Sequence, residues 1–292
     1  MSSLSIPTTH VKSGTRSPSF KTILGKTLLY AVLIALAALT LLPFIWMLSA
    51  SLKADKDVFR FPIEWFPANP QWSNYAEIWT EVPFLTFFLN TTKLTVIVTA
   101  LQVATSSFAA YAFAKLQFRG RDVLFLAYIA SIAIPWQVYM IPQFIGMRSL
   151  GLVDDHLSLI LLQAFSAFGV FLLRQFFISI PNELLDAARI DGLSEYGIYF
   201  RIMLPLSKPA LATLTIFTAV TVWNDFMGPL IYLNSESQKT IQLGLRMFIQ
   251  QYSADYALIM AASLVSLIPV TILFLAFQRF FVEGIASTGI KG

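Results

Sequence analysis

The sequence predicts an all-α polytopic membrane protein with six transmembrane helices. Its composition indicates the class, because 57% of its 292 residues are hydrophobic and only 12% are charged, whereas soluble domains carry about 25% charged residues. The number of helices comes from long runs with few or no charges, since about 20 apolar residues cross the hydrocarbon core of a bilayer. The chain has no cysteine, which excludes disulfide bonds and thiolate chemistry.

Residues 1–26 are predicted to be a cytoplasmic tail, because they are rich in Ser, Thr and Pro and carry basic but no acidic side chains. Residues 27–51 contain no charged side chain and are predicted to form the first span. A cleaved signal peptide is the alternative, but its apolar region covers only about 7–15 residues. Residues 27–292 are therefore expected to form one membrane domain.

Five further spans are expected after a polar loop at residues 53–83, whose tryptophans suit the membrane interface. The third span contains Pro135 and Pro142, and we expect a kink there because proline removes a backbone hydrogen bond. The predicted spans are 85–114, 123–147, 157–180, 209–233 and 256–278.

Six spans place both termini on one side of the membrane, and the Lys and Arg residues predict that this side is the cytoplasm. With the N-terminus inside, 13 basic residues lie on the inside and 6 on the outside, as expected for positively charged cytoplasmic loops. The inside residues are Lys12, Arg16, Lys21, Lys26, Lys115, Arg119, Arg121, Arg174, Arg189, Arg201, Lys208, Arg279 and Lys291. The outside residues are Lys53, Lys56, Arg60, Arg148, Lys239 and Arg246.

Residues 181–208 are the one long charged segment between apolar runs, and this orientation places them in the cytoplasm. Pro181 suits the first turn of a helix, Gly192 suits a left-handed helix end, and Ser194 suits the N-cap of a second helix. We expect that second helix to end before Pro205. From the pattern alone, an amphipathic connector and a docking element for another protein remain equally open.

The sequence shows no motif for ATP binding or covalent catalysis. It lacks the GxxxxGK[ST] phosphate loop, so the chain is not expected to hydrolyse ATP. Its two histidines, His10 and His156, lie far apart, and no metal-ligand spacing or GxSxG nucleophile motif occurs. We therefore expect no catalytic residue, no metal and no cofactor in this chain.

Polar side chains inside the spans are candidates for a solute path, because such groups are costly in lipid and usually face a bundle interior or a cavity. Asp225 stands out, and Trp223 and Asn224 precede it. Trp223 is able to stack on a sugar ring, and its two polar neighbours are able to bind hydroxyls. A packing or capping cluster near the outer end of the fifth span is the alternative. Asn90 and Gln137 are weaker candidates, with inter-helix hydrogen bonds as their alternative.

A resemblance to a known family adds to this picture. Residues Asp186-Ala187-Ala188, Gly192, Ile202, Leu204 and Pro205 resemble the EAA loop, E-A-A-x3-G-x9-I-x-L-P, of permease subunits in binding-protein-dependent ABC importers. Both spacings agree, and Asp186 stands where the pattern has Glu. The resemblance runs from about residue 27 to residue 292 and favours the carbohydrate-uptake, maltose-permease-like branch. The segments similar to that branch are Ser51–Lys53, Trp72–Tyr75, Ala109–Arg121, Trp223–Asp225 and Gly289–Gly292.

The resemblance implies a type I ABC importer permease in a prokaryotic cytoplasmic (inner) membrane. Such a subunit pairs with a second homologous permease, two ATPase subunits that bind ATP and Mg, and an extracytoplasmic sugar-binding protein. Its solute would be a di- or oligosaccharide or a derivative. The EAA loop would carry the coupling helix that docks on the ATPase.

The coupling residues expected from this resemblance lie mainly between Asp186 and Gly192. The alanines are small enough for a close backbone approach, and Asp186 and Arg189 are suited to ion pairs at the rim of the contact. The full set is Glu183, Asp186, Ala187, Ala188, Arg189, Asp191, Gly192, Pro205 and Lys291. An autonomous secondary transporter or channel is the alternative function, but the sequence shows no internal repeat that would favour it.

Overall fold

The computed structural model describes residues 20–249 and 255–289, with side chains described in 24–249 and 255–278. Contacts divide the chain into two units, residues 1–47 and 48–292, and each is described by itself. In the described part the regular secondary structure is helical, as predicted. In chain order the elements are α1 (Phe20–Ser51), η1 (Asp55–Asp57), α2 (Asn74–Glu77), α3 (Phe84–Lys115), α4 (Arg121–Ala130), η2 (Ser131–Ala133), α5 (Trp136–Ser149), α6 (His156–Gln163), α7 (Ala167–Ser179), α8 (Asn182–Ile190), α9 (Glu195–Ile198), η3 (Tyr199–Met203), α10 (Leu204–Leu206), α11 (Lys208–Trp223), α12 (Met227–Tyr232), η4 (Glu236–Gln238), α13 (Ile241–Met247) and α14 (Tyr256–Gly289).

Four helices in the described part are long and apolar enough to cross a membrane, and the number rises to six if each of two bent helix pairs is one span. The upper number equals the six predicted spans, although the second bent pair includes residues 195–206, which precede the predicted span 209–233. The four are Leu24–Ser51, Phe84–Lys115, His156–Ser179 and Tyr256–Gln278. The bent pairs are Arg121–Ala133 with Trp136–Ser149, and Glu195–Leu206 with Lys208–Trp223. The first helix begins at Phe20, seven residues before the predicted position, and residues 1–19 of the predicted tail lie outside the described part.

Three of the predicted spans are interrupted. The third bends by 99° between η2 and α5, where Pro135 adopts an extended conformation and starts a new helix. The fourth breaks between α6 and α7, and the Ser166 hydroxyl caps α7 by accepting a hydrogen bond from the Gly169 amide at 3.0 Å. The fifth breaks between α11 and α12. The third interruption was predicted, and it is sharper than the expected kink. Gly228 and Pro229 were expected to loosen the fifth span, and the break lies just before them. The fourth interruption was not predicted.

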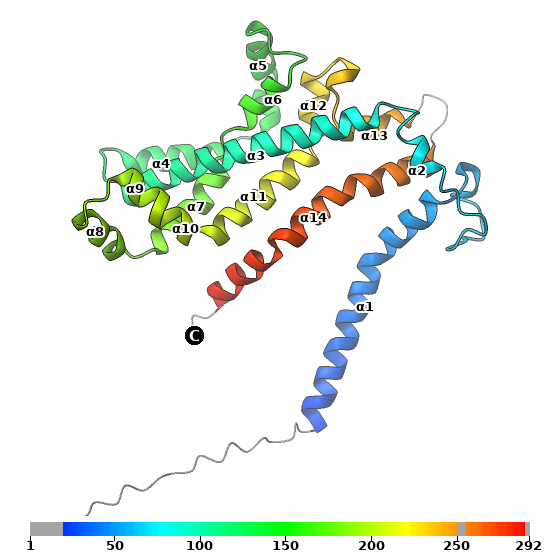
Figure 1. Ribbon diagram of the computed structural model, residues 1–292, viewed down its shortest axis with the longest axis horizontal. Helices are drawn as coiled ribbons and strands as arrows, with labels where there is room; N and C mark the ends of the chain where they lie inside the picture. Colours follow the sequence, from blue (N-terminus) through cyan, green and yellow to red (C-terminus); the bar gives the residue numbers. More distant parts are fainter. Residues whose placement is uncertain (1–19, 250–254, 290–292) are drawn as a thin grey trace, which may run out of the picture. The chain divides into compact units, whose positions relative to one another are not determined.

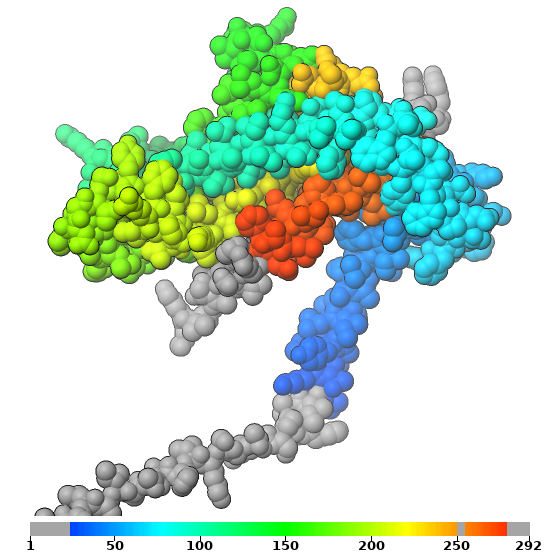
Figure 2. All heavy atoms as spheres, viewed as in Figure 1, coloured from blue at the N-terminus to red at the C-terminus, as the bar shows by residue number. Residues whose placement is uncertain are grey.

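The second unit is built around α3 and α11. Helix α3 packs against α7 and α11, and α11 also packs against α14 (Figure 1). Gly169 permits the close approach of α7 to α3, because a Cβ there would lie 2.5 Å from Ser106 Oγ. Figure 1 shows α8, α9 and α10 at one end of α3, and α2 and α13 at the other end. In Figure 2, α3 partly covers α11.

The charged segment after α7 folds largely as the sequence predicts. Gly192 ends α8 with a φ of 83°, and the Ser194 hydroxyl caps α9 by accepting from the Gly197 amide at 3.2 Å. The expected stop before Pro205 is wrong, because the chain continues through the π-helical turn η3 into α10, which contains Pro205. Hydrogen bonds in a π turn skip one more residue, which relieves the clash of the proline ring with a preceding carbonyl. The 78° bend follows at Ser207, before α11.

Candidate functional site

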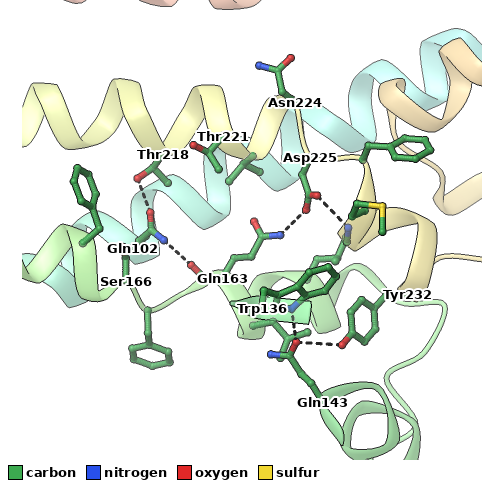
Figure 3. Close-up of a pocket in the computed structure, with 18 of the residues that line it drawn as sticks. Gln102, Trp136, Gln143, Gln163, Ser166, Thr218, Thr221, Asn224, Asp225 and Tyr232 are labelled. Carbon is green, nitrogen blue, oxygen red and sulfur yellow. Dashed lines mark hydrogen bonds between the residues drawn. The ribbon is translucent and has the colours of Figure 1, made fainter. Parts of the chain in front are cut away.

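A cavity of about 790 Å³ lies where the three interrupted spans meet (Figure 3). Its wall includes Trp136 at the start of α5, Ser166 in the α6–α7 break, and Asn224 and Asp225 in the α11–α12 break. Irregular backbone at membrane depth is tolerated where it is buried in protein or lines a water-filled cavity. The other lining residues are Gln102, Tyr139, Gln143, Leu159, Leu162, Gln163, Phe165, Phe168, Phe217, Thr218, Thr221, Val222, Phe226, Met227, Gly228 and Tyr232.

Helix α3 supplies hydrogen-bond donors to backbone carbonyls at the α6–α7 break. Gln102 Nε2 donates to the Gln163 carbonyl at 3.1 Å, and Thr105 Oγ1 donates to the Ala164 carbonyl at 2.7 Å. The Gln102 side-chain oxygen in turn accepts a hydrogen bond from the Thr218 hydroxyl on α11. This network joins α3, α6 and α11 along one wall of the cavity (Figure 3).

Asp225 lies in the α11–α12 break and accepts hydrogen bonds from the end of α6 and from the first turn of α12. Gln163 Nε2 donates to Asp225 Oδ2 at 2.8 Å, and the Gly228 amide donates to Oδ1 at 3.0 Å. A Cβ at position 228 would lie 2.5 Å from the same carboxylate. Asp225 therefore caps the first turn of α12 and also lines the cavity, so both of the alternatives considered for it describe this side chain.

Gln143 organises the opposite side of the cavity. Its side-chain oxygen accepts from Trp136 Nε1 at 2.9 Å and from Tyr232 Oη at 3.4 Å. Sequence reasoning missed Gln102, Gln143 and Gln163. A signal for them existed, because each is an amide within a predicted apolar span.

The other residues predicted for the solute path lie elsewhere. Trp223 is only 4% exposed, its ring meets Phe88 edge to face, and its indole donates to the Ser266 carbonyl at 3.0 Å. Its ring is therefore used for packing between α3, α11 and α14 rather than for stacking on a solute in the cavity. Asn90 donates to the carbonyls of the loop around η4, at 2.8 and 3.0 Å. Gln137 is exposed on α5, outside the cavity wall.

Helix α8 turns one face to the core of its own chain and leaves the other exposed. Leu185 is 1% exposed and Ala188 is 5% exposed, and both belong to a hydrophobic cluster with residues of α3 and α7. Ala188 was expected to approach a partner protein closely. Its side chain is instead buried within its own chain. The exposed residues of α8 and its C-cap are Asn182, Glu183, Leu184, Asp186, Ala187, Arg189, Ile190 and Asp191.

Arg189 already has two carboxylate partners within the chain. Its Nη1 lies 2.7 Å from Asp186 Oδ1, and its Nε lies 2.8 Å from Glu195 Oε1. The hydrogen bond from Arg189 lowers the pKa of the Glu195 carboxyl below its ordinary value. Such partly exposed ion pairs add little stability by themselves. The pair between Arg189 and Glu195 nevertheless links α8 to α9 across the Gly192 turn.

Two side chains of α3 hold the charged segment at two points. Tyr111 Oη donates to Glu195 Oε2 at 2.6 Å. Lys115 Nζ donates to the Ile180 carbonyl at 2.6 Å and to Asn182 Oδ1 at 2.8 Å. Positions i and i+4 share one face of a helix, so Tyr111 and Lys115 together form what we call the α3 clamp. Sequence reasoning missed the clamp, although the spacing of these residues within the Ala109–Arg121 segment was a usable signal.

The remaining coupling residues are placed as follows. Pro205 lies in α10, two residues before the bend at Ser207. Lys291 lies outside the described residues. A Cβ added at Gly192 would meet nothing within 4 Å, so glycine is required there for its positive φ rather than for space. At Gly197 space is tighter, because a Cβ would lie 3.0 Å from Leu193 Cδ2.

Comparison with known proteins gives consistent matches over most of the chain. Residues 102–287 match the family model described as "binding-protein-dependent transport system inner membrane component". The chain is 35% identical over 260 residues to the arabinooligosaccharides transport system permease protein AraQ of Halalkalibacterium halodurans, covering 88% of this chain and 93% of that protein. It is 32% identical over 259 residues to the lactose transport system permease protein LacG of Rhizobium radiobacter, covering 89% and 94%. A crystal structure of a bacterial ABC transporter involved in the import of the acidic polysaccharide alginate matches with a TM-score of 0.80 and 27% identity, over 91% of this chain and 100% of that chain.

Proposed function

This chain belongs to the family of binding-protein-dependent transport system inner membrane components, and from that premise we propose that it imports a di- or oligosaccharide or a sugar derivative. It is a multi-pass permease subunit of a sugar ABC importer, and its role is transport rather than catalysis. The observation that supports the choice of solute is the cavity of amide, hydroxyl and aromatic side chains at the meeting point of three broken spans. Such groups suit a sugar, whose hydroxyls need hydrogen-bond partners and whose C–H faces pack on rings.

The partners and the orientation form the second part of the proposal. An extracytoplasmic binding protein delivers the sugar, and a second homologous permease completes the path across a prokaryotic inner membrane. Two ATPase subunits bind ATP and Mg on the cytoplasmic side, where both termini of this chain lie, and this chain carries no cofactor. The excess of Lys and Arg on the predicted inside segments supports this orientation.

The charged segment 181–208 is proposed to couple this permease to its ATPase. The exposed face of α8 supports the proposal, because Ile190 is 86% exposed and Leu184 is 49% exposed on a helix whose other face is packed. Large exposed apolar side chains outside the membrane are typical of a protein contact. Tyr196 on α9 is 73% exposed as well. Glu183, Ala187 and Asp191 are exposed polar or small residues of α8 and its C-cap.

Reconstitution of the complete importer tests the proposed function. We expect uptake of a labelled oligosaccharide into proteoliposomes to require ATP, the binding protein and both permeases. Uptake by this subunit alone, driven by an ion gradient without ATP, would instead support an autonomous secondary transporter. An Ile190→Asp variant should insert normally and lose copurification with the ATPase. Phe66→Asp, at an 88% exposed residue of the loop on the predicted outer side, should keep it.

A further inference from the structure

The cavity contains one formally charged side chain among the described residues of its wall, and that charge is negative. Asp225 is this residue, and the remaining lining residues are amides, hydroxyls, aromatic rings and aliphatic groups. Neither a lysine nor an arginine nor a histidine lines it. Asp225 belongs to none of the ion pairs of the described residues. The guanidinium of Arg246 lies 5.9 Å from the ring centre of Phe226, a lining residue, but Arg246 itself does not line the cavity.

Burial of Asp225 opposes its ionised form, and its hydrogen bonds favour that form. Each carboxylate oxygen accepts one N–H, from Gln163 on one side and from Gly228 on the other. A carboxylate that accepts hydrogen bonds is stabilised relative to the protonated acid, which has one acceptor fewer. These donors carry no net charge, so they leave a negative potential in the cavity.

The other polar groups match uncharged hydroxyls. An amide offers both donors and acceptors, and a sugar hydroxyl likewise donates once and accepts twice. Because the oxygen of Gln143 accepts from Trp136 and Tyr232, its amide N–H groups are the donors that this side chain has to offer a solute. Rings such as Tyr139 and Phe217 provide surfaces for sugar C–H groups.

We propose that this cavity takes a neutral oligosaccharide and selects against acidic sugars, with Asp225 as the residue that sets the selection. This inference rests on the proposed function and names the class of its solute. A uronate in the cavity would face a like charge, in surroundings where charges are poorly screened. No cationic side chain among the described lining residues of this chain is placed to neutralise it. The structurally similar importer acts on an acidic polysaccharide, so the shared fold does not by itself decide the charge of the solute.

The absence of cysteine from the chain allows a direct measurement of the cavity potential. Thr221 lines the cavity, and its hydroxyl bonds only to the Phe217 carbonyl of its own helix among the described residues. The Thr221→Cys variant is assembled into the importer, and the labelling rate of its cysteine is measured with two methanethiosulfonate reagents. One reagent carries a cationic trimethylammonium group, and the other carries an anionic sulfonate group. We expect the cationic reagent to react about tenfold faster, after correction for their rates with a free thiol. Adding Asp225→Asn should bring the ratio near one, whereas Asp225→Glu should keep it.

Protection of the same cysteine tests the solute. Neutral trisaccharides (maltotriose, raffinose or arabinotriose) should slow labelling, and trigalacturonate should not. Asn224→Lys adds a cation to the same wall without removing Asp225, and it should raise labelling by the anionic reagent and allow protection by trigalacturonate. This second variant keeps the test decisive if Asp225→Asn fails to assemble.

Two results would overturn the inference while leaving the proposed function intact. One is protection by trigalacturonate equal to that by neutral trisaccharides in the unmodified wall. The other is a reagent ratio that stays the same when Asp225→Asn assembles normally. If no saccharide protects the cysteine and ATP drives no uptake of any of them, the proposed function itself fails, and the inference fails with it.

Discussion

The two functional regions of this chain are polar in different ways. The shape of the charged segment 181–208 is fixed by ion pairs, with Arg189 between Asp186 and Glu195. The α3 clamp holds the start of α8 and the start of α9. The cavity uses amides and hydroxyls, and its one carboxylate has only uncharged donors. A coupling element must keep its geometry while force is transmitted through it. The side chains of a solute path must instead be able to exchange hydrogen bonds with each other for hydrogen bonds with the solute. Charge pairs suit the first task and neutral amides suit the second.

The largest expected effect separates the buried face of α8 from its exposed face. Ala188→Asp places an unpaired carboxylate in the cluster around Leu185, at a cost of about 3–5 kcal/mol. We expect the segment to become sensitive to protease and assembly to be lost. The adjacent Ala187→Asp is the matched control, because Ala187 is exposed. That variant should keep its protease resistance and affect only copurification with the ATPase. Equal protease sensitivity of both variants would contradict this assignment of the two faces.

The next effect concerns the cavity. Gly228→Ala places a Cβ 2.5 Å from Asp225 Oδ2 and 3.2 Å from Leu159 Cδ2, so the carboxylate must move. We expect uptake to fall about tenfold, which corresponds to ~1.4 kcal/mol, while ATPase copurification is retained. Gly146→Ala on α5 is the control, because a Cβ there meets nothing within 4 Å. Unchanged uptake by Gly228→Ala would show that the position of Asp225 is not needed for transport.

A smaller effect is expected from the α3 clamp. Tyr111→Phe removes one hydrogen bond to Glu195, which is worth about 0.5–1.5 kcal/mol. Uptake should fall about twofold to tenfold, and more ATP should be hydrolysed per sugar imported. Tyr196→Phe, at an exposed tyrosine of the same region, should leave this ratio unchanged. If the amount of ATP hydrolysed per sugar imported is unchanged in both variants, the clamp has no role in coupling.

The smallest effect is a pH dependence of the charged segment. The pKa of Glu195 is lowered in the folded protein by the hydrogen bond from Arg189. Its contribution to stability is therefore present above the ordinary glutamate pKa of about 4.3 and is lost as the pH falls through the lower folded value. Melting temperatures of the wild type and Glu195→Gln should differ at pH 7 and converge in acid. A difference that grows in acid would show that the sign of the pKa shift is wrong.

Much of the fold could be predicted because membrane insertion leaves a strong pattern in the sequence. Runs without charge gave the six spans, and the Gly192 and Ser194 positions gave the turn between α8 and α9. The break after Gln163 was not predicted, and for the break after Trp223 only a loosened helix at Gly228 and Pro229 was expected. Both breaks depend on hydrogen bonds to the side chains of Ser166 and Asp225. Such capping is visible only when the neighbouring helices are in place.

The site was predicted less completely than the fold. Asn224 and Asp225 line the cavity, but the amides that complete it come from α3, α5 and α6, which are distant in sequence. Local reasoning made Ala188 a contact residue because it is small, whereas tertiary packing places it against the core. Which face of a short amphipathic helix is buried depends on the helix beside it, and no local pattern contains that information.

Helix α3 connects the cavity to the charged segment, and this fixes the number of residues between the side chains that it contributes to each. It contributes Gln102 to the cavity and Tyr111 to the clamp. Nine residues of an α-helix span ~14 Å and about two and a half turns, so the two side chains leave opposite sides of one rod. Inserting one residue between them would rotate one relative to the other by about 100°. Insertions and deletions between Gln102 and Tyr111 would therefore change the orientation of the cavity wall relative to the clamp. A substitution at an exposed position between them, such as Phe108, would leave that orientation unchanged.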